Sequence, residues 1–294
     1  MSVWLKTARL AAFGLALAAV ARPAAAEDAT VLPDTSRVVA IGGAVTEIVF
    51  ALGEQKHLVA RDSTGTYPEA AKALPDVGYM RALSPEGVLS VDPTGIIALQ
   101  GSGPKEAVDV LKKASVPYVE VPETYDNEGI LERIRVVGKA LGVEDKAAAL
   151  AADTEAKLKA AEARTAGIDK KKRVLFILSM QGDKVMAAGA HTGADGIVRL
   201  AGAANAIEGF SGYKQLSDEA IVTAAPDVIL MMDHAGPGVS DDDLFDNAAI
   251  SQTPAGQARK VIRMDGGYLL GYGPRTADAI SDLSKALYGD KAAD

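Results

Sequence analysis

The chain contains no cysteine, three histidines and a single tryptophan among its 294 residues. The absence of cysteine excludes disulfides, thiolate metal sites, iron–sulfur clusters and cysteine nucleophiles. Three scattered histidines argue against a site for a bare metal ion, which needs several histidine or carboxylate ligands. Acidic residues outnumber basic ones by 39 to 31, for a formal net charge of −8. Because nucleic-acid binding depends on clustered positive charge, we expect no nucleic-acid partner.

Signatures of the common enzyme classes are also missing. The chain has no G-x-S-x-G nucleophile elbow, and its glycine-rich stretch 101–105 lacks the spacing of a phosphate-binding P-loop. No nucleophile stands in a recognisable arrangement with a general base. We therefore expect a protein that is not an enzyme.

The first 26 residues have the composition of a cleaved secretory signal. Lys6 and Arg9 supply a positive start, residues 10–21 form an apolar run, and residues 24–26 are three alanines suited to signal peptidase. The apolar run is too short to span a bilayer comfortably, although a membrane anchor is the alternative. A lipid anchor on cysteine is excluded. We expect residues 1–26 to be removed and the remainder to be exported as a soluble protein.

Short apolar segments alternate with helical patterns along the rest of the chain. The predicted strands are 37–42, 57–60, 95–99, 118–121, 173–178, 184–188, 228–232 and 260–264. The predicted helices between them are 47–52, 104–114, 127–141 and 195–201. Such alternation is typical of an α/β fold with a parallel sheet whose faces are covered by helices.

Residues 144–166 separate the two halves of this pattern. They are rich in alanine, lysine and glutamate, with no proline or glycine, which favours one continuous helix of about 34 Å. We predict an N-terminal lobe over 27–142, a linking helix over 143–168 and a C-terminal lobe over 169–294.

The two halves share a short repeat. Segments 83–97 and 216–230 both begin with Leu-Ser-x-Glu and continue with apolar residues at helical spacing, a proline and a strand. The serines are expected to cap the two helices, and the glutamates fall where the helix dipole favours anions. These residues are Ser84, Ser217, Glu86 and Glu219. Two similar lobes explain the repeat most simply, with chance similarity as the alternative.

Four segments carry a resemblance to a known family: 61–68, 77–84, 212–217 and 270–275. With the two-lobe pattern, they resemble the substrate-binding proteins of ABC importers for iron complexes, haem and cobalamin. Within that group the chain looks most like the periplasmic haem-binding proteins. The resemblance implies two lobes, each with a mainly parallel sheet flanked by helices, joined by one long rigid helix. It also implies a periplasmic carrier that receives haem downstream of an outer-membrane receptor system and delivers it to an ABC permease dimer with its ATPase subunits.

The resemblance implies that Tyr67, in the Tyr-Pro loop, is the axial ligand of haem iron. A phenolate is a hard, anionic oxygen donor that suits ferric iron, and tyrosine is an established haem ligand. The residues alone leave open a tyrosine that packs against Pro68 in an ordinary turn.

Other residues of these segments are candidate haem contacts. Arg61 and Arg81 could orient Tyr67 or pair with the propionates, since arginine matches a carboxylate with two donors. Lys214 could reach the ligand from the second lobe. Three tyrosines could stack on the porphyrin, with an ordinary core or rim position as the alternative for each: Tyr79, Tyr213 and Tyr272. His191 lies in a glycine-flanked loop and is a second candidate iron ligand, although no family motif includes it.

The family resemblance gives Glu86 and Glu219 a separate role. One glutamate from each lobe is expected to pair with arginines of the two permease subunits, since exposed carboxylates suit reversible, salt-sensitive docking. Plain stabilisation of the two helix starts is the alternative. For the ligand, a ferric siderophore, cobalamin or another metal complex bound by the same fold remains the second hypothesis.

Overall fold

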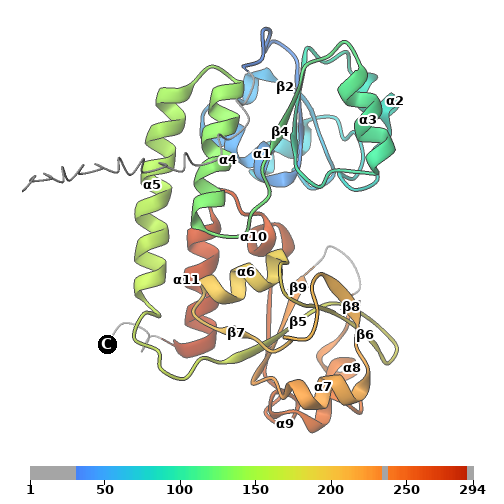
Figure 1. Ribbon diagram of the computed structural model, residues 1–294, viewed down its shortest axis with the longest axis vertical. Helices are drawn as coiled ribbons and strands as arrows, with labels where there is room; N and C mark the ends of the chain where they lie inside the picture. Colours follow the sequence, from blue (N-terminus) through green and yellow to red (C-terminus); the bar gives the residue numbers. More distant parts are fainter. Residues whose placement is uncertain (1–30, 234–237, 290–294) are drawn as a thin grey trace, which may run out of the picture.

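A computed structural model describes residues 31–233 and 238–289 of the chain (Figure 1). The predicted secretory signal, residues 1–26, lies outside the described residues. Within the described ranges, no helix combines the length and the apolar character needed to cross a bilayer. The chain forms two α/β lobes beside one long helix, as the sequence predicted (Figure 1).

The N-terminal lobe is built on a parallel sheet of four strands in the order β2-β1-β3-β4. Its strands are β1 (Val38–Ile41), β2 (Leu58–Arg61), β3 (Gly95–Leu99) and β4 (Tyr118–Val121). Its helices are α1 (Gly43–Ala51), α2 (Pro85–Leu89), α3 (Lys105–Lys113) and α4 (Asn127–Ala140), with short 3-10 turns η1 (Gln55–His57) and η2 (Glu69–Ala73). Every residue of β1 and β3 is buried, because helices cover both faces of the sheet.

The C-terminal lobe has a mixed sheet in the order β10-β9-β5-β6-β8, with β7 also paired to β5. Its strands are β5 (Arg173–Gln181), β6 (Lys184–Ala188), β7 (Ala204–Asn205), β8 (Tyr213–Gln215), β9 (Val228–Asp233) and β10 (Val261–Asp265). Its helices are α6 (Gly193–Leu200), α7 (Asp218–Ala224), α8 (Asp241–Asp246), α9 (Pro254–Gln257), α10 (Gly266–Leu270) and α11 (Thr276–Tyr288), with the 3-10 turn η3 (Ile250–Gln252). Strands β10, β9, β5 and β7 pair in parallel, whereas β6 pairs antiparallel with both of its neighbours, β5 and β8.

Strand β5 separates two cores in the C-terminal lobe. Because successive side chains of a strand point to opposite faces, Val174 and Phe176 join one apolar cluster while Leu175 and Ile177 join another. The first cluster also contains residues of α6, α10 and α11, and the second contains residues of α7, α8 and α9.

Helix α5 (Glu144–Ala163) runs alongside both lobes (Figure 1). It packs against α4 of the first lobe and α11 of the second. A Cβ atom on Gly138 of α4 would lie 2.1 Å from that of Ala147, so the absence of a side chain permits this close approach. The helix ends three residues before the predicted limit of 166, at Ala163. The predicted lobe boundaries remain predictions.

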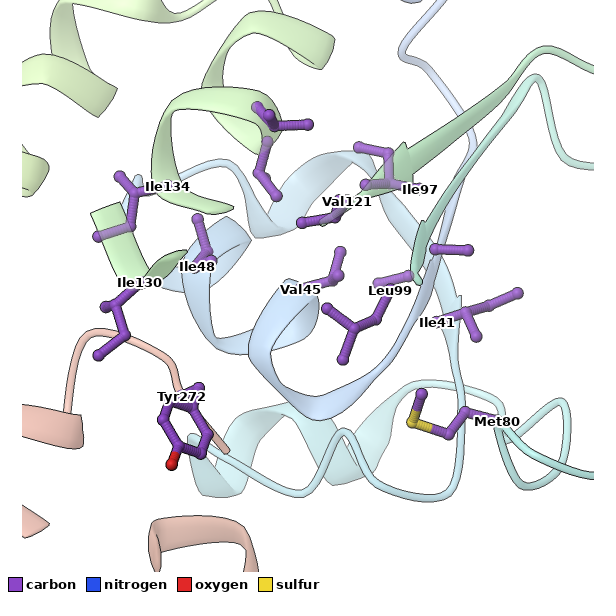
Figure 2. Packing of buried hydrophobic residues seen from close by; sticks show 14 of the residues in the cluster. Ile41, Val45, Ile48, Met80, Ile97, Leu99, Val121, Ile130, Ile134 and Tyr272 are labelled. Carbon is purple, nitrogen blue, oxygen red and sulfur yellow. The ribbon is translucent and has the colours of Figure 1, made fainter. Parts of the chain in front are cut away.

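One apolar cluster continues from the first lobe into the second. It includes Ile48 and Ile130 of the N-terminal lobe together with Ile197 and Leu283 of the C-terminal lobe. Tyr272 belongs to the same cluster (Figure 2). The lobes are therefore joined by shared packing as well as by α5.

Candidate functional site

The Tyr-Pro loop follows β2 at the carboxyl end of the first lobe's parallel sheet. The side chain of Tyr67 is 44% exposed, unusual for a large aromatic ring. The guanidinium carbon of Arg275, which follows α10 in the second lobe, lies 3.3 Å from the centre of this ring. Carboxyl ends of strands are where open α/β sheets gather ligand-binding loops, so this position suits a binding residue.

Arg275 is held in place by a buried carboxylate of the first lobe. Its backbone N–H donates to Glu47 Oε1 at 2.9 Å, and its Nε donates to Glu47 Oε2 at 3.0 Å. The Glu47 side chain is 7% exposed. Arg275 thus joins α1, Tyr67 and the second lobe. Arg275 lies in segment 270–275, one of the segments that carry the family resemblance, but no role was predicted for it. Its partner Glu47 is remote in sequence, so only the folded chain reveals the role.

Other candidate residues of the two lobes are exposed. Tyr79 is 48% exposed and Tyr213, on β8, is 39% exposed. Arg81 is exposed and lies 3.6 Å from Glu123. Burial of part of the Tyr213 side chain raises the pKa of its phenol, and the positive charge of Arg81 on the other lobe opposes that rise. That Arg81 and Tyr213 line one binding region remains a prediction.

Tyr125 is less exposed than Tyr79 and Tyr213. Burial, reinforced by the negative charge of Glu123, raises the pKa of Tyr125 to about 12. Its ring centre is 5.2 Å from that of Tyr272. Tyr125 therefore stays protonated at neutral pH and continues the aromatic packing into the interior.

The geometry of Arg61 does not suit direct contact with a ligand. Its side chain is only 10% exposed, and its Nη1 donates to Asp76 Oδ2 at 2.7 Å and to the Asp62 carbonyl at 3.1 Å. Of the two roles expected for Arg61, the geometry suits orientation of the Tyr67 loop and does not suit pairing with a propionate. Its Nη1 is occupied by Asp62 of its own loop and by Asp76 of the neighbouring segment.

Tyr272 corrects an expectation: it does not present its ring for stacking on a ligand. It is fully buried, and its hydroxyl donates to the Gly193 carbonyl at 2.5 Å. Arg133, also buried, lies 5.4 Å from the ring centre and donates Nη1 to the Tyr272 carbonyl at 3.1 Å. Burial raises the pKa of Tyr272 well above its usual value. Tyr272 is a packing residue between the lobes.

The remaining candidates of the second lobe are exposed. His191 precedes α6 with a left-handed backbone (φ 58°), and its N–H donates to Asp195 at 3.3 Å. Lys214, on β8, lies 5.1 Å from the centre of the Phe210 ring. Both side chains are accessible. Among the described residues, no group of three histidine, aspartate or glutamate side chains could hold a bare metal ion.

The two repeat glutamates occupy matched positions. Ser84 and Ser217 cap α2 and α7, as predicted, by accepting from the N–H of Gly87 at 3.4 Å and of Ala220 at 3.2 Å. Glu86 and Glu219 lie exposed in the first turns of these helices. Neither forms an ion pair within the part of the chain that the structure describes.

Comparisons with known proteins agree with this architecture. The family described as "periplasmic binding protein" matches residues 38–268, and the chain belongs to it. The periplasmic haem-binding protein BhuT, solved in complex with two haems, is 40% identical (TM-score 0.81; 88% of this chain, 99% of that one). The haem-binding protein RhuT of Roseiflexus sp. RS-1 is 37% identical (TM-score 0.82; 88% and 100%). The uncharacterised ABC transporter substrate-binding lipoprotein YvrC of Bacillus subtilis is 27% identical over 90% of this chain and 83% of its own length.

The buried hydroxyl of Tyr272 provides a test of this packing that needs no ligand. Tyr272→Phe removes only the hydroxyl, leaving the Gly193 carbonyl without its buried donor, and should lower the free energy of unfolding by about 1–3 kcal/mol. Urea denaturation measures this change. Tyr79→Phe, whose ring is exposed, is the control and should stay within about 0.5 kcal/mol of the wild type. Equal stabilities for the two variants would contradict the packing role.

Proposed function

We propose that this chain binds haem in the periplasm and delivers it to an ABC permease dimer with its ATPase subunits. The observation that carries the proposal is the exposed phenol of Tyr67, held by an arginine of the opposite lobe. Its oxygen is a suitable donor to ferric iron. The haem-binding relatives BhuT and RhuT, 40% and 37% identical over nearly their whole lengths, support haem as the ligand.

The neighbouring residues fit the rest of a porphyrin. The exposed rings of Tyr79 and Tyr213 offer flat apolar faces for stacking, one from each lobe. The exposed cations Arg81 and Lys214 can pair with the two propionate carboxylates. The proposed role is binding and transfer without catalysis. A ferric siderophore or cobalamin suits the same fold, but the identities above favour haem.

Loss of the Tyr67 oxygen should weaken hemin binding more than any other single hydroxyl deletion. Tyr67→Phe removes the proposed iron ligand and should raise the hemin Kd roughly 100-fold. The charge-transfer band of a tyrosine-ligated ferric haem should disappear. Hemin titration followed by visible absorption measures both. Tyr79→Phe keeps its stacking ring and should bind hemin as the wild type does. A wild-type spectrum for Tyr67→Phe would refute ligation by this residue.

His191→Ala tests whether a second axial ligand exists. With Tyr67 as the sole protein ligand, the variant should keep the absorption spectrum of five-coordinate ferric haem and bind hemin within about threefold of the wild type. Electron paramagnetic resonance of the hemin complex reports the spin state. A change from low to high spin on substitution would show that His191 completes a six-coordinate iron.

Glu86 and Glu219 are the proposed contacts with the permease. Each is an exposed carboxylate at a helix start, and each lobe presents one, which fits a transporter with two membrane subunits. Charged residues at the edge of an interface mainly affect steering and salt dependence. Two weak contacts on one rigid body reinforce each other, because forming the first raises the effective concentration of the second.

Replacing both glutamates should separate docking from haem binding. The Glu86→Ala/Glu219→Ala double variant should bind hemin normally yet reduce stimulation of the transporter's ATPase by roughly tenfold in reconstituted vesicles. Each single variant should lose less, and the salt dependence of docking should weaken. The control is Glu144→Ala/Asp278→Ala, which removes first-turn carboxylates from α5 and α11. Normal stimulation by the first double variant would leave the glutamates with helix stabilisation alone.

A further inference from the structure

Asp62 is a fully buried aspartate between β2 and the Tyr67 loop. Its Oδ1 accepts from the Gly42 N–H at 2.9 Å and from the Thr64 hydroxyl at 2.8 Å. Its Oδ2 accepts from the Thr64 N–H at 3.1 Å and from the Met80 N–H at 3.2 Å. One carboxylate therefore holds the start of α1, the Tyr67 loop and the segment 79–81.

A second carboxylate strengthens the connection between the two loops. Asp76 Oδ1 accepts from the Ser63 hydroxyl at 3.0 Å and from the Gly78 N–H at 2.8 Å, and its Oδ2 accepts from Arg61. The Ser63 N–H donates to the Gly78 carbonyl at 2.9 Å. Asp76 is itself exposed, so water can replace part of this network. Asp62 is fully buried, so water cannot replace its hydrogen bonds in this way.

The surroundings leave the two loops little freedom. A Cβ atom on Gly65 would lie 2.6 Å from the Thr46 hydroxyl, and one on Gly43 would lie 2.7 Å from the Thr64 carbonyl. The Tyr67 loop is thus pressed against α1. Met80 is 6% exposed and belongs to the core cluster that contains Ile41 and Leu99 (Figure 2). The neighbours of Met80, Tyr79 and Arg81, are both exposed, so a buried anchor carries two accessible side chains.

The donors around Asp62 require a carboxylate. Burial raises the pKa of this carboxyl, while hydrogen bonds from Thr64, Gly42 and Met80 oppose that rise. Gly42 also precedes α1, whose dipole favours a negative charge at this end. An asparagine would offer one acceptor oxygen in place of two, and its NH₂ group would face one of the N–H donors. With the NH₂ group in the place of Oδ2, the Thr64 and Met80 N–H groups would both lose their acceptor, so both loops would lose an attachment.

We propose that Asp62 is the positioning residue of the binding region, holding the Tyr67 phenol and the Tyr79–Arg81 segment at a fixed separation. This inference rests on the proposed function for the identity of the ligand. A ligand whose central atom meets Tyr67 while its periphery meets Tyr79 and Arg81 needs both loops at once. Holding them in advance removes the cost of ordering them on binding.

The test compares Asp62→Asn with the wild type in two measurements. In the ligand-free protein, hydrogen–deuterium exchange should become at least about tenfold faster in 63–68 and 76–81, since both loops lose a buried tether. In hemin titrations the affinity should fall roughly 10- to 100-fold, the range for residues that orient a metal ligand. The charge-transfer band should shift or broaden, because Tyr67 no longer approaches the iron in one geometry.

Two controls separate positioning from general loss of stability. Asp227→Asn makes the same chemical change in the second lobe, just before β9, where Asp227 accepts from the Arg173 N–H at 2.9 Å. Leu244→Ala destabilises the second core, at α8. Both should leave the charge-transfer band unchanged. If Asp62→Asn does not fold, Thr64→Val removes the hydroxyl that contacts the carboxylate and should shift exchange and affinity in the same direction by a smaller factor.

Each outcome bears on one of the two hypotheses. An unchanged band and affinity in folded Asp62→Asn would overturn the positioning role, as would unchanged exchange in the two loops. The same spectral change in Leu244→Ala would also overturn it. A wild-type protein that gives no Soret shift with hemin would instead refute haem as the ligand. In that case the exchange data alone still decide whether Asp62 ties the loops together.

Discussion

The orientation of the two lobes depends on the packing of residues 271–276 of the second lobe against the first. Arg133 donates to three backbone carbonyls, those of Pro122, Thr124 and Tyr272, and Glu47 binds Arg275 through its backbone and its guanidinium. These buried charged groups satisfy one another or backbone atoms, as buried charges must. Burial lowers the pKa of Arg133, yet the three carbonyls can be satisfied only by a donor of this shape.

This packing has a consequence for motion between the lobes. A long helix alone would allow the lobes to bend about its ends. Here the apolar cluster around Tyr272 continues through both lobes, so a wide opening would expose buried surface and break the contacts of Arg133. We therefore expect small displacements, comparable to shear between packed elements, and no wide hinge opening. Such rigidity would suit the proposed docking through Glu86 and Glu219, because it fixes the separation of the two carboxylates.

The same packing connects structure to ligand binding. Arg275 is fixed by Glu47 and lies against the ring of Tyr67, so the second lobe limits where the phenol can point. From the other side, Asp62 holds the backbone of the Tyr67 loop. The proposed iron ligand is thus constrained at both its ring and its backbone. Preorganisation of this kind favours one geometry of a metal–ligand bond.

Much of the fold could be predicted from local pattern. The strand cores, the long helix and the serine caps of α2 and α7 depend on the nearest neighbours in sequence, so periodicity and capping residues reveal them. The strand at 184–188 was predicted, but the antiparallel direction of β6 was not, because strand direction is decided by pairing partners. The roles of Tyr67 and of the repeat glutamates were predicted from the family resemblance, and they remain predictions.

Residue order alone was therefore enough to predict the two-lobe α/β architecture and a short set of candidate residues. Which of these residues are accessible depends on how the chain packs. Tyr272 and Tyr67 share residue type and loop setting, yet one is fully buried and the other 44% exposed. Arg275 stayed unassigned and Arg61 was given two possible roles, since their partners Glu47 and Asp76 meet them only in the folded chain. Exposure and long-range pairing are properties of packing, and no local pattern encodes them.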